Sequence, residues 1–119
     1  MKYQKWSIWR ANLDPVIGSE QGKVRPVLII SEDDINAIIN IVNILPITSR
    51  KPGRIVYPNE VLIPAGNYGL EKESIVLCHQ IRTIDKARLS KRYGQISSKV
   101  KKEEIMEALG FQLGLYNMF

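Results

Sequence analysis

Two polar side chains at the ends of apolar segments are of types that bind phosphate. Arg25 lies between a glycine-containing loop and the apolar run at residues 27–30. Its planar guanidinium can bind two phosphate oxygens at once, and a buried strand would hold it in place. Thr48 follows another apolar segment, and its hydroxyl can donate a hydrogen bond to a phosphoryl oxygen on which negative charge develops. Taken alone, each residue is more often an ordinary surface or turn residue.

Glu20 and His79 are side chains that can move a proton. Glu20 lies in the glycine-containing loop, where it could act as a general base or orient Arg25 through a salt bridge. His79 is the only histidine, and imidazole titrates near neutral pH, so it could act as an acid or base or stack on a nucleobase. A histidine that contacts a ligand without transferring a proton is the simpler interpretation. Because a free arginine is a poor base at neutral pH, the identity of a general base stays open.

The composition favours one globular domain with a polyanionic partner. The 119 residues carry 17 Lys and Arg against 12 Asp and Glu, for a formal net charge of +5. The basic excess lies between Lys86 and Lys102, a segment without acidic residues, although a solvated surface can have the same composition. One Cys and one His exclude an internal disulfide and a four-ligand zinc site. No apolar run has the roughly 18 residues of a membrane span. We therefore expect a cytoplasmic protein without metal, cofactor or membrane segment.

Alternating and continuous apolar patterns predict a mainly-β chain with helices. The strands expected from these patterns are 7–13, 25–31, 39–47, 54–63, 74–81 and 94–96. Residues 31–34 have the form of a capping box and predict a short helix to about residue 38, and 85–89 predict one helical turn. From about Lys99 the period becomes helical, and one face of that helix carries Ile105, Met106, Leu109, Leu113 and Tyr116. Five or six short strands and a C-terminal helix predict a small, strongly bent sheet or barrel, in a single domain spanning 1–119.

Three ordered motifs resemble those of the MazF/PemK-like toxin family. The N-terminal motif covers residues 8–15 (IWRANLDP), 18–21 (GSEQ) and 25–31 (RPVLIIS). The second motif is PITSR at residues 46–50, and the third is QIRTIDK at residues 80–86. Their order and spacing fit the family from end to end, including the C-terminal helix. Each motif alone is weak, but the three in order are specific.

The resemblance implies a fold, an activity and partners. Members of this family fold as a compact SH3-like barrel with added helices and form homodimers. They are sequence-specific ribonucleases that cut single-stranded RNA without a metal and leave a 2′,3′-cyclic phosphate and a 5′-hydroxyl. An antitoxin encoded beside the toxin usually covers the active surface. The implied catalytic residues are Arg25, Thr48 and Glu20, and the implied RNA-binding residues are Ser19, Gln21, Lys23, Ser49, His79 and Gln80.

Two positions depart from the family pattern, and two other functions stay open. His79 stands where the family usually has an acid, and Lys23 stands where it often has a glycine, which affects loop shape and cleavage preference. A CcdB-like toxin, which poisons gyrase by binding protein, has the same barrel and depends on apolar C-terminal residues such as those at 115–119. A catalytically inert RNA-binding relative, in which the change to His79 has removed activity, is the other alternative.

Overall fold

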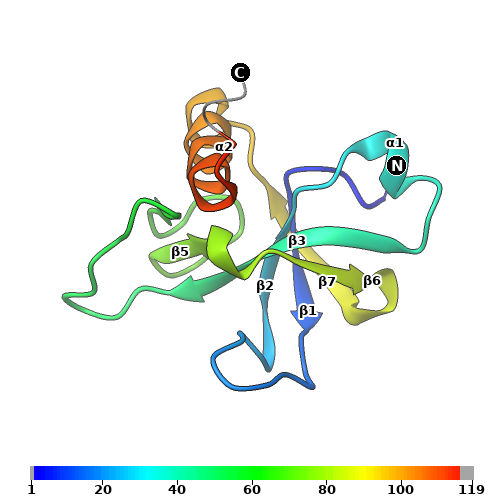
Figure 1. The fold of residues 1–119 in the computed structure, drawn as a ribbon, viewed down its shortest axis with the longest axis horizontal. Coiled ribbons are helices and arrows are strands. Elements are labelled where there is room, and N and C mark those ends of the chain that lie inside the picture. The colour runs from blue at the N-terminus through cyan, green and yellow to red at the C-terminus, as the bar shows by residue number, and fades with distance from the viewer. Residues whose placement is uncertain (1, 116–119) are drawn as a thin grey trace.

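An antiparallel sheet and one long helix form the fold. The computed structural model describes residues 2–115, and Figure 1 shows the helix α2 standing against one side of the sheet. The strands are β1 (Ser7–Asn12), β2 (Val24–Ile29), β3 (Ile41–Ser49), β4 (Glu60–Ile63), β5 (Ser74–Leu77), β6 (Arg82–Asp85) and β7 (Leu89–Gln95). The helices are α1 (Asp33–Asn36) and α2 (Lys99–Leu113), with the 3-10 turns η1 (Cys78–Gln80) and η2 (Lys86–Arg88). The expected mainly-β fold with a C-terminal helix is confirmed.

Strand β3 connects the two halves of the sheet. The strand order is β4-β5-β3-β2-β1-β7, and β6 also pairs with β3. One edge of β3 pairs with β2, and the other pairs first with β6 and then with β5. The first half of β3 therefore lies in one curved sheet and its last residues in the other. This position brings the C-terminal end of β3 close to the start of β2.

The continuous apolar runs are buried on both faces, as their pattern predicts. Val27 and Ile29 pack in one hydrophobic cluster, whereas Leu28 and Ile30 pack in a second cluster that α2 covers. Side chains alternate between the faces of a strand, so a strand between two cores must be apolar at every position. Burial of each such side chain contributes about 1.5–3 kcal/mol, which makes β2 a rigid support for the residue at its start.

Helix α2 packs through a narrower face than its sequence predicts. Ile105 and Leu109 are buried as expected, but Met106 is 44% exposed and Leu113 is 49% exposed. Ala108 is buried instead, because residues three and four positions apart share one face of a helix. The expected contribution of Tyr116 falls outside the described residues. In the part of the chain that the structure covers, no helix is long and apolar enough to cross a membrane.

Two expected strands are shorter in the structure, and one strand is not predicted by the sequence. Of the segment 54–63, only β4 is a strand, because the preceding residues turn around a buried ion pair. In the segment 74–81, β5 is shorter than expected and ends at Leu77. Val76 pairs with Ile47 of β3 and Arg82 pairs with Ile44, so the five residues 77–81 lie opposite only two residues of β3. The surplus residues form the turn η1 instead of continuing the strand. Strand β6 follows directly, and β7 begins well before the expected 94–96.

The helix α1 forms where expected, but its predicted capping box is wrong. The N-cap residue is Glu32, and its side chain makes no capping hydrogen bond. Ser31 instead donates from Oγ to Oδ1 of Asn36 at 2.6 Å and accepts from the amide of Asn43 at 3.1 Å. The buried amide of Asn36 needs hydrogen-bond partners, and Ser31 supplies two, its hydroxyl and its carbonyl oxygen.

Candidate active site

Arg25 and Thr48 face each other across β2 and β3. Val27 pairs with Pro46 in the antiparallel register, so two residues further along Arg25 lies opposite Thr48. Directly opposed residues of antiparallel strands place their side chains on the same face. Nη1 of Arg25 accordingly donates a hydrogen bond to Oγ1 of Thr48 at 3.3 Å, across a sequence separation of 23 residues. The structure thus brings the guanidinium and the hydroxyl to one point.

The Arg25 guanidinium is anchored by the preceding loop and keeps free donors. Its Nε donates to the carbonyl oxygen of Gly22 at 2.8 Å. Arginine has five N–H donors, and the bonds to Gly22 and Thr48 use two of them. Among residues 2–115 no carboxylate forms an ion pair with Arg25. Both Arg25 and Thr48 are partly exposed, so an anion such as phosphate can reach an uncompensated positive charge.

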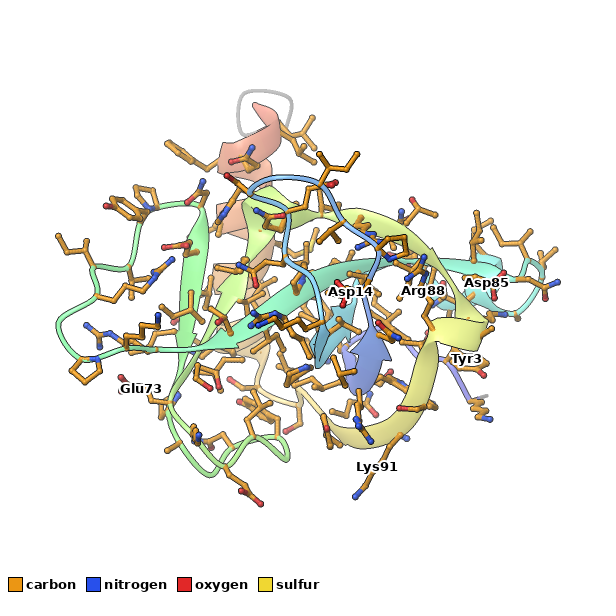
Figure 2. The ribbon with its side chains drawn as sticks, turned by 90° about the horizontal axis from the view of Figure 1, so that it is seen from below. Tyr3, Asp14, Glu73, Asp85, Arg88 and Lys91 are labelled. Carbon is orange, nitrogen blue, oxygen red and sulfur yellow. The ribbon has the colours of Figure 1, made fainter. Side chains whose placement is uncertain are left out.

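The loop at residues 14–23 is closed at its base. The amide of Lys23 donates to Oδ1 of Asp14 at 2.8 Å. Nη1 of Arg88 donates to the carbonyl oxygen of Asp14 at 2.6 Å, and Figure 2 shows these two residues close together. A Cβ atom at Gly22 would lie 2.6 Å from the same Asp14 carboxylate, so the tight approach requires glycine. These contacts fix the backbone that leads into β2.

Gln80 joins η1 to the tip of this loop. Its Nε2 donates to the carbonyl oxygen of Ser19 at 3.2 Å, and its Oε1 accepts from the amide of Gln21 at 3.3 Å. These partners lie 61 and 59 residues from Gln80 in the sequence. Because the carboxamide binds the loop backbone at two points, Gln80 positions the loop. A carboxamide has a second donor and a second acceptor site, so direct RNA binding by Gln80 stays a prediction.

Glu20 lies between the two anchored loop residues. Its Oε1 accepts from the amide of Ile17 at 2.6 Å, and its side chain is exposed. The salt bridge to Arg25 that was one of its two expected roles does not occur among the ion pairs of the described residues. Its role as a general base stays a prediction. Beside it, Oε1 of Gln21 is buried, and no described residue gives it a hydrogen bond.

Lys23 adopts a left-handed backbone conformation with φ of 63°. A glycine, which the family often has here, adopts this conformation freely, whereas a side chain with a Cβ raises its energy by about 1 kcal/mol. The Lys23 side chain is exposed, so its ammonium is available to a ligand of the loop. RNA binding by Lys23 stays a prediction.

Ser49 is separated from the other expected site residues. Successive residues of a strand point to opposite faces, so Ser49 faces away from the side of β3 that carries Thr48. It lines a hollow together with Lys72 and Lys91, and not the space in front of Arg25. Sequence adjacency to Thr48 therefore does not make Ser49 part of the same site surface.

His79 lies apart from both Thr48 and Ser49, on the turn η1. It is exposed and, with Tyr57 and Glu60, lines a hollow of about 420 Å³. Among residues 2–115, no hydrogen bond or ion pair joins His79 to Arg25. The structure thus brings Arg25, Thr48 and the Gln80-bound loop together, whereas His79 lines a separate hollow.

The sequence does not predict the ion pair that organises the residues before β4. The Glu60 side chain is 1% exposed, and Arg54 binds it with Nη1 to Oε1 at 3.0 Å and Nη2 to Oε2 at 2.7 Å. The hydrogen bond from Arg54 is the largest cause that holds the pKa of Glu60 below its usual value, and burial opposes it. The amide of Tyr57 and the charges of Arg54 and His79 lower this pKa further. The turn-forming residues 57–59 are the sequence signal against a continuous strand here.

We expect Glu60→Gln to lower the free energy of unfolding by about 2 kcal/mol at pH 7. Loss of one partner of a buried pair costs about 3–5 kcal/mol, and the effect is smaller here because the Arg54 side chain is 32% exposed. A carboxyl group whose pKa is lowered on folding stabilises the protein at pH values above its unfolded pKa, which is 4.5 for Glu60. That stabilisation is lost as the pH falls through the lowered pKa of the folded state. Urea unfolding from pH 7 to acid should therefore show a flatter profile for the variant.

Glu103→Gln is the matched control for this measurement. Glu103 pairs with Lys99 at 3.9 Å on the exposed face of α2, with side chains 60% and 91% exposed. Exposed pairs contribute between 0 and about 1 kcal/mol, so this variant should unfold like the wild type. Equal stability of Glu60→Gln and Glu103→Gln at pH 7 would show that the buried pair does not stabilise the fold.

Comparison with known proteins gives the family of this chain. A family model described as PemK-like, MazF-like toxin of type II toxin-antitoxin system matches residues 4–113. Endoribonuclease MazF from Staphylococcus saprophyticus is 38% identical over 115 residues, which cover 97% of this chain and 94% of the relative. The crystal structure of MazF from Deinococcus radiodurans superposes with a TM-score of 0.76 at 30% identity, covering 93% of this chain and 94% of the other.

A more distant structure shares the fold. A mycobacterial endoribonuclease solved in complex with its cognate antitoxin superposes with a TM-score of 0.76 at 22% identity, covering 94% of this chain and 95% of the other. The expectation of an endoribonuclease toxin is confirmed by the family match and the relatives' names. The chain belongs to the PemK-like, MazF-like toxin family of type II toxin–antitoxin systems.

Proposed function

We propose that this endoribonuclease toxin cleaves single-stranded RNA in a sequence-specific way, and that Arg25 and Thr48 bind the scissile phosphate. The observation that carries the proposal is the 3.3 Å contact between Nη1 of Arg25 and Oγ1 of Thr48, which puts a cation and a hydroxyl donor side by side. Both groups stabilise negative charge on phosphoryl oxygens. The resemblance of the motifs around Arg25 and Thr48 to those of the family implies the same roles for these two residues.

The proposed reaction is an attack by the RNA on itself. The 2′-hydroxyl next to the scissile phosphate is the nucleophile, so RNA and not DNA is the substrate. Its oxygen forms a bond to phosphorus while the bond from phosphorus to the 5′-oxygen of the next nucleotide breaks. The products are a 2′,3′-cyclic phosphate and a 5′-hydroxyl, and a general acid or water supplies the proton that the leaving 5′-oxygen takes up. Arg25 binds oxygens of the pentacoordinate phosphorus, and Thr48 donates a hydrogen bond to one of them.

A base must take the proton of the 2′-hydroxyl, and Glu20 and His79 are the candidates. We expect the acidic limb of the pH–rate profile to persist in His79→Gln, since within residues 2–115 no hydrogen bond or ion pair links His79 to Arg25. We expect Glu20→Gln to remove that limb. A limb near pH 6–7 that disappears in His79→Gln would assign proton transfer to the imidazole instead.

Incubation of the purified protein with a mixed-sequence RNA in EDTA tests the proposed function. We expect cleavage at a limited set of sequences, with 2′,3′-cyclic phosphate ends, and no cleavage of DNA of the same sequence. Binding without products would favour the catalytically inert relative. Neither binding nor cleavage would favour a protein target of the CcdB-like kind.

We also propose that the toxin forms a homodimer through an apolar surface between α1 and α2. Ile35, Ile81 and Met106 are 49%, 36% and 44% exposed. They line one hollow of about 390 Å³ together with the buried Leu109. A contiguous exposed apolar patch is typical of an interaction site, and the family resemblance implies a second copy as its occupant.

We expect Met106→Asp to convert the dimer to a monomer. A carboxylate at the centre of an apolar interface would lose its hydration without gaining a partner, which costs several kcal/mol. Val100→Asp adds the same charge to α2 at a residue that is 64% exposed and does not line the hollow. Light scattering after gel filtration measures the mass of both variants. A Met106→Asp protein that stays dimeric would place the interface elsewhere.

The remaining proposals concern the protein partner, the domain organisation and the cellular location of the enzyme. We propose an antitoxin encoded beside the toxin as its protein partner, by analogy with the mycobacterial complex that shares its fold. The antitoxin would cover the surface that carries Arg25 and Thr48. We further propose that residues 1–119 act as a single domain in the cytoplasm, where the RNA substrate is found.

A further inference from the structure

A second polar groove opens on the face opposite the Arg25–Thr48 pair. It has a volume of about 560 Å³, and its lining includes Pro26, Ser49, Lys72, Lys91 and Arg92. Pro26 and Ser49 directly follow Arg25 and Thr48 in the sequence, and alternation along a strand turns their side chains to the other face. This groove, called the basic groove below, therefore begins one residue away from the proposed catalytic pair.

Two glycines build one wall of the basic groove. A Cβ atom at Gly69 would lie 2.1 Å from the carbonyl oxygen of Tyr93, and one at Gly94 would lie 2.2 Å from the carbonyl oxygen of Tyr68. The backbone of the turn before β5 thus touches the backbone of β7 at two reciprocal points, which only glycine permits. The contact holds the segment that carries Lys72 against β7, which carries the other two cations of the groove.

The cations of the basic groove are gathered without acidic partners. Lys91 on β7 pairs in register with Arg10 on β1, and like charges directly opposite each other destabilise a sheet. Within residues 2–115, neither Lys72 nor Lys91 takes part in an ion pair, and Arg10, which lines a different hollow, has none either. The guanidinium of Arg92 donates hydrogen bonds to two glutamine side chains, which are neutral and leave its charge uncompensated. Glu71 is the one acid in the described lining.

We propose that the basic groove binds backbone phosphates of the RNA next to the scissile phosphate. The inference rests on the proposed function, because it places the RNA at Arg25 and Thr48. To reach the cations from there, the RNA must turn past β2 and β3 to the face on which Pro26 and Ser49 lie. Figure 2 shows Lys91 pointing away from β7 into solvent, where a flexible ammonium can follow a mobile backbone. Contacts of this kind raise affinity for every sequence and do not read bases.

The test compares two double variants that lower the net charge equally. Lys72→Ala/Lys91→Ala removes two cations of the basic groove. Lys2→Ala/Lys99→Ala removes two exposed lysines outside it. The probe is a fluorescein-labelled random 24-nucleotide RNA with 2′-O-methyl groups, which cannot react by attack of the 2′-oxygen, and a gel of the recovered probe checks that it stays intact. Anisotropy titrations from about 50 to 200 mM salt give the dissociation constant and its salt dependence.

The expected result is a change in slope for the groove variant alone. Each phosphate contact to a single strand contributes about 0.7 to the slope of log affinity against log salt, so the loss of two contacts should reduce its magnitude by about 1.4. An unchanged slope for the groove variant, or an equal change in both variants, overturns the proposal. Cleavage of unmodified RNA by the wild type is measured separately, so failure of the proposed function and failure of the groove are distinguishable.

Discussion

Arg25→Ala should abolish RNA cleavage while leaving the fold intact. The guanidinium stands opposite the Thr48 hydroxyl, with no acidic partner among the described residues and three N–H donors unused by its two hydrogen bonds. An arginine that stabilises the transition state of phosphoryl transfer contributes roughly 10³–10⁵-fold to the rate. We therefore expect the cleavage rate of a labelled RNA under single-turnover conditions to fall by at least roughly 10³-fold.

Two observations separate loss of chemistry from loss of structure in this experiment. Arg25 lies outside both hydrophobic clusters, so its removal should change the free energy of unfolding by only about 1 kcal/mol. Arg25→Lys keeps the charge but not the planar fork, so it should cleave better than Arg25→Ala and worse than the wild type. Full cleavage by a folded Arg25→Ala protein would refute the assigned role.

Thr48→Val should reduce the cleavage rate by roughly 10²-fold, in line with the loss of one hydrogen-bond donor to a developing negative charge. Valine keeps the shape and the β-branch that suit β3, so the strand and its pairing with Ile75 on β5 should survive. Among the described residues, the hydroxyl forms a hydrogen bond only with the Arg25 guanidinium, so its contribution to stability should be small.

A split between the kinetic constants identifies where the hydroxyl acts. If the Thr48 hydroxyl donates to the transition state, kcat falls and KM changes little in Thr48→Val. Thr48→Ser retains the donor and should keep most of the activity. A Thr48→Val protein with unchanged kcat and a raised KM would mean that the hydroxyl serves only to bind RNA.

The apolar patterns predict most of the fold because buried positions recur with the period of the strand or helix that carries them. Continuous runs at β2 and β3 correspond to strands between two cores, and the helical period after Lys99 corresponds to α2. The pattern fails where polar contacts decide the conformation. The Arg54–Glu60 pair organises the residues before β4, which begins only at Glu60, and an apolar period does not reveal which charged residues pair.

The sequence by itself determined the fold class, the family and the two residues of the proposed catalytic pair, since these depend on local types and spacing. Tertiary structure alone decided what surrounds that pair. Contacts between segments about 60 residues apart bind Gln80 to the loop of Glu20. Strand alternation turns Ser49 to the opposite face from Thr48. Because residues 77–81 lie opposite only residues 45–46 of β3, the chain forms the turn η1, which carries His79. Such placements depend on pairing register and on long-range contacts, which residue spacing does not encode.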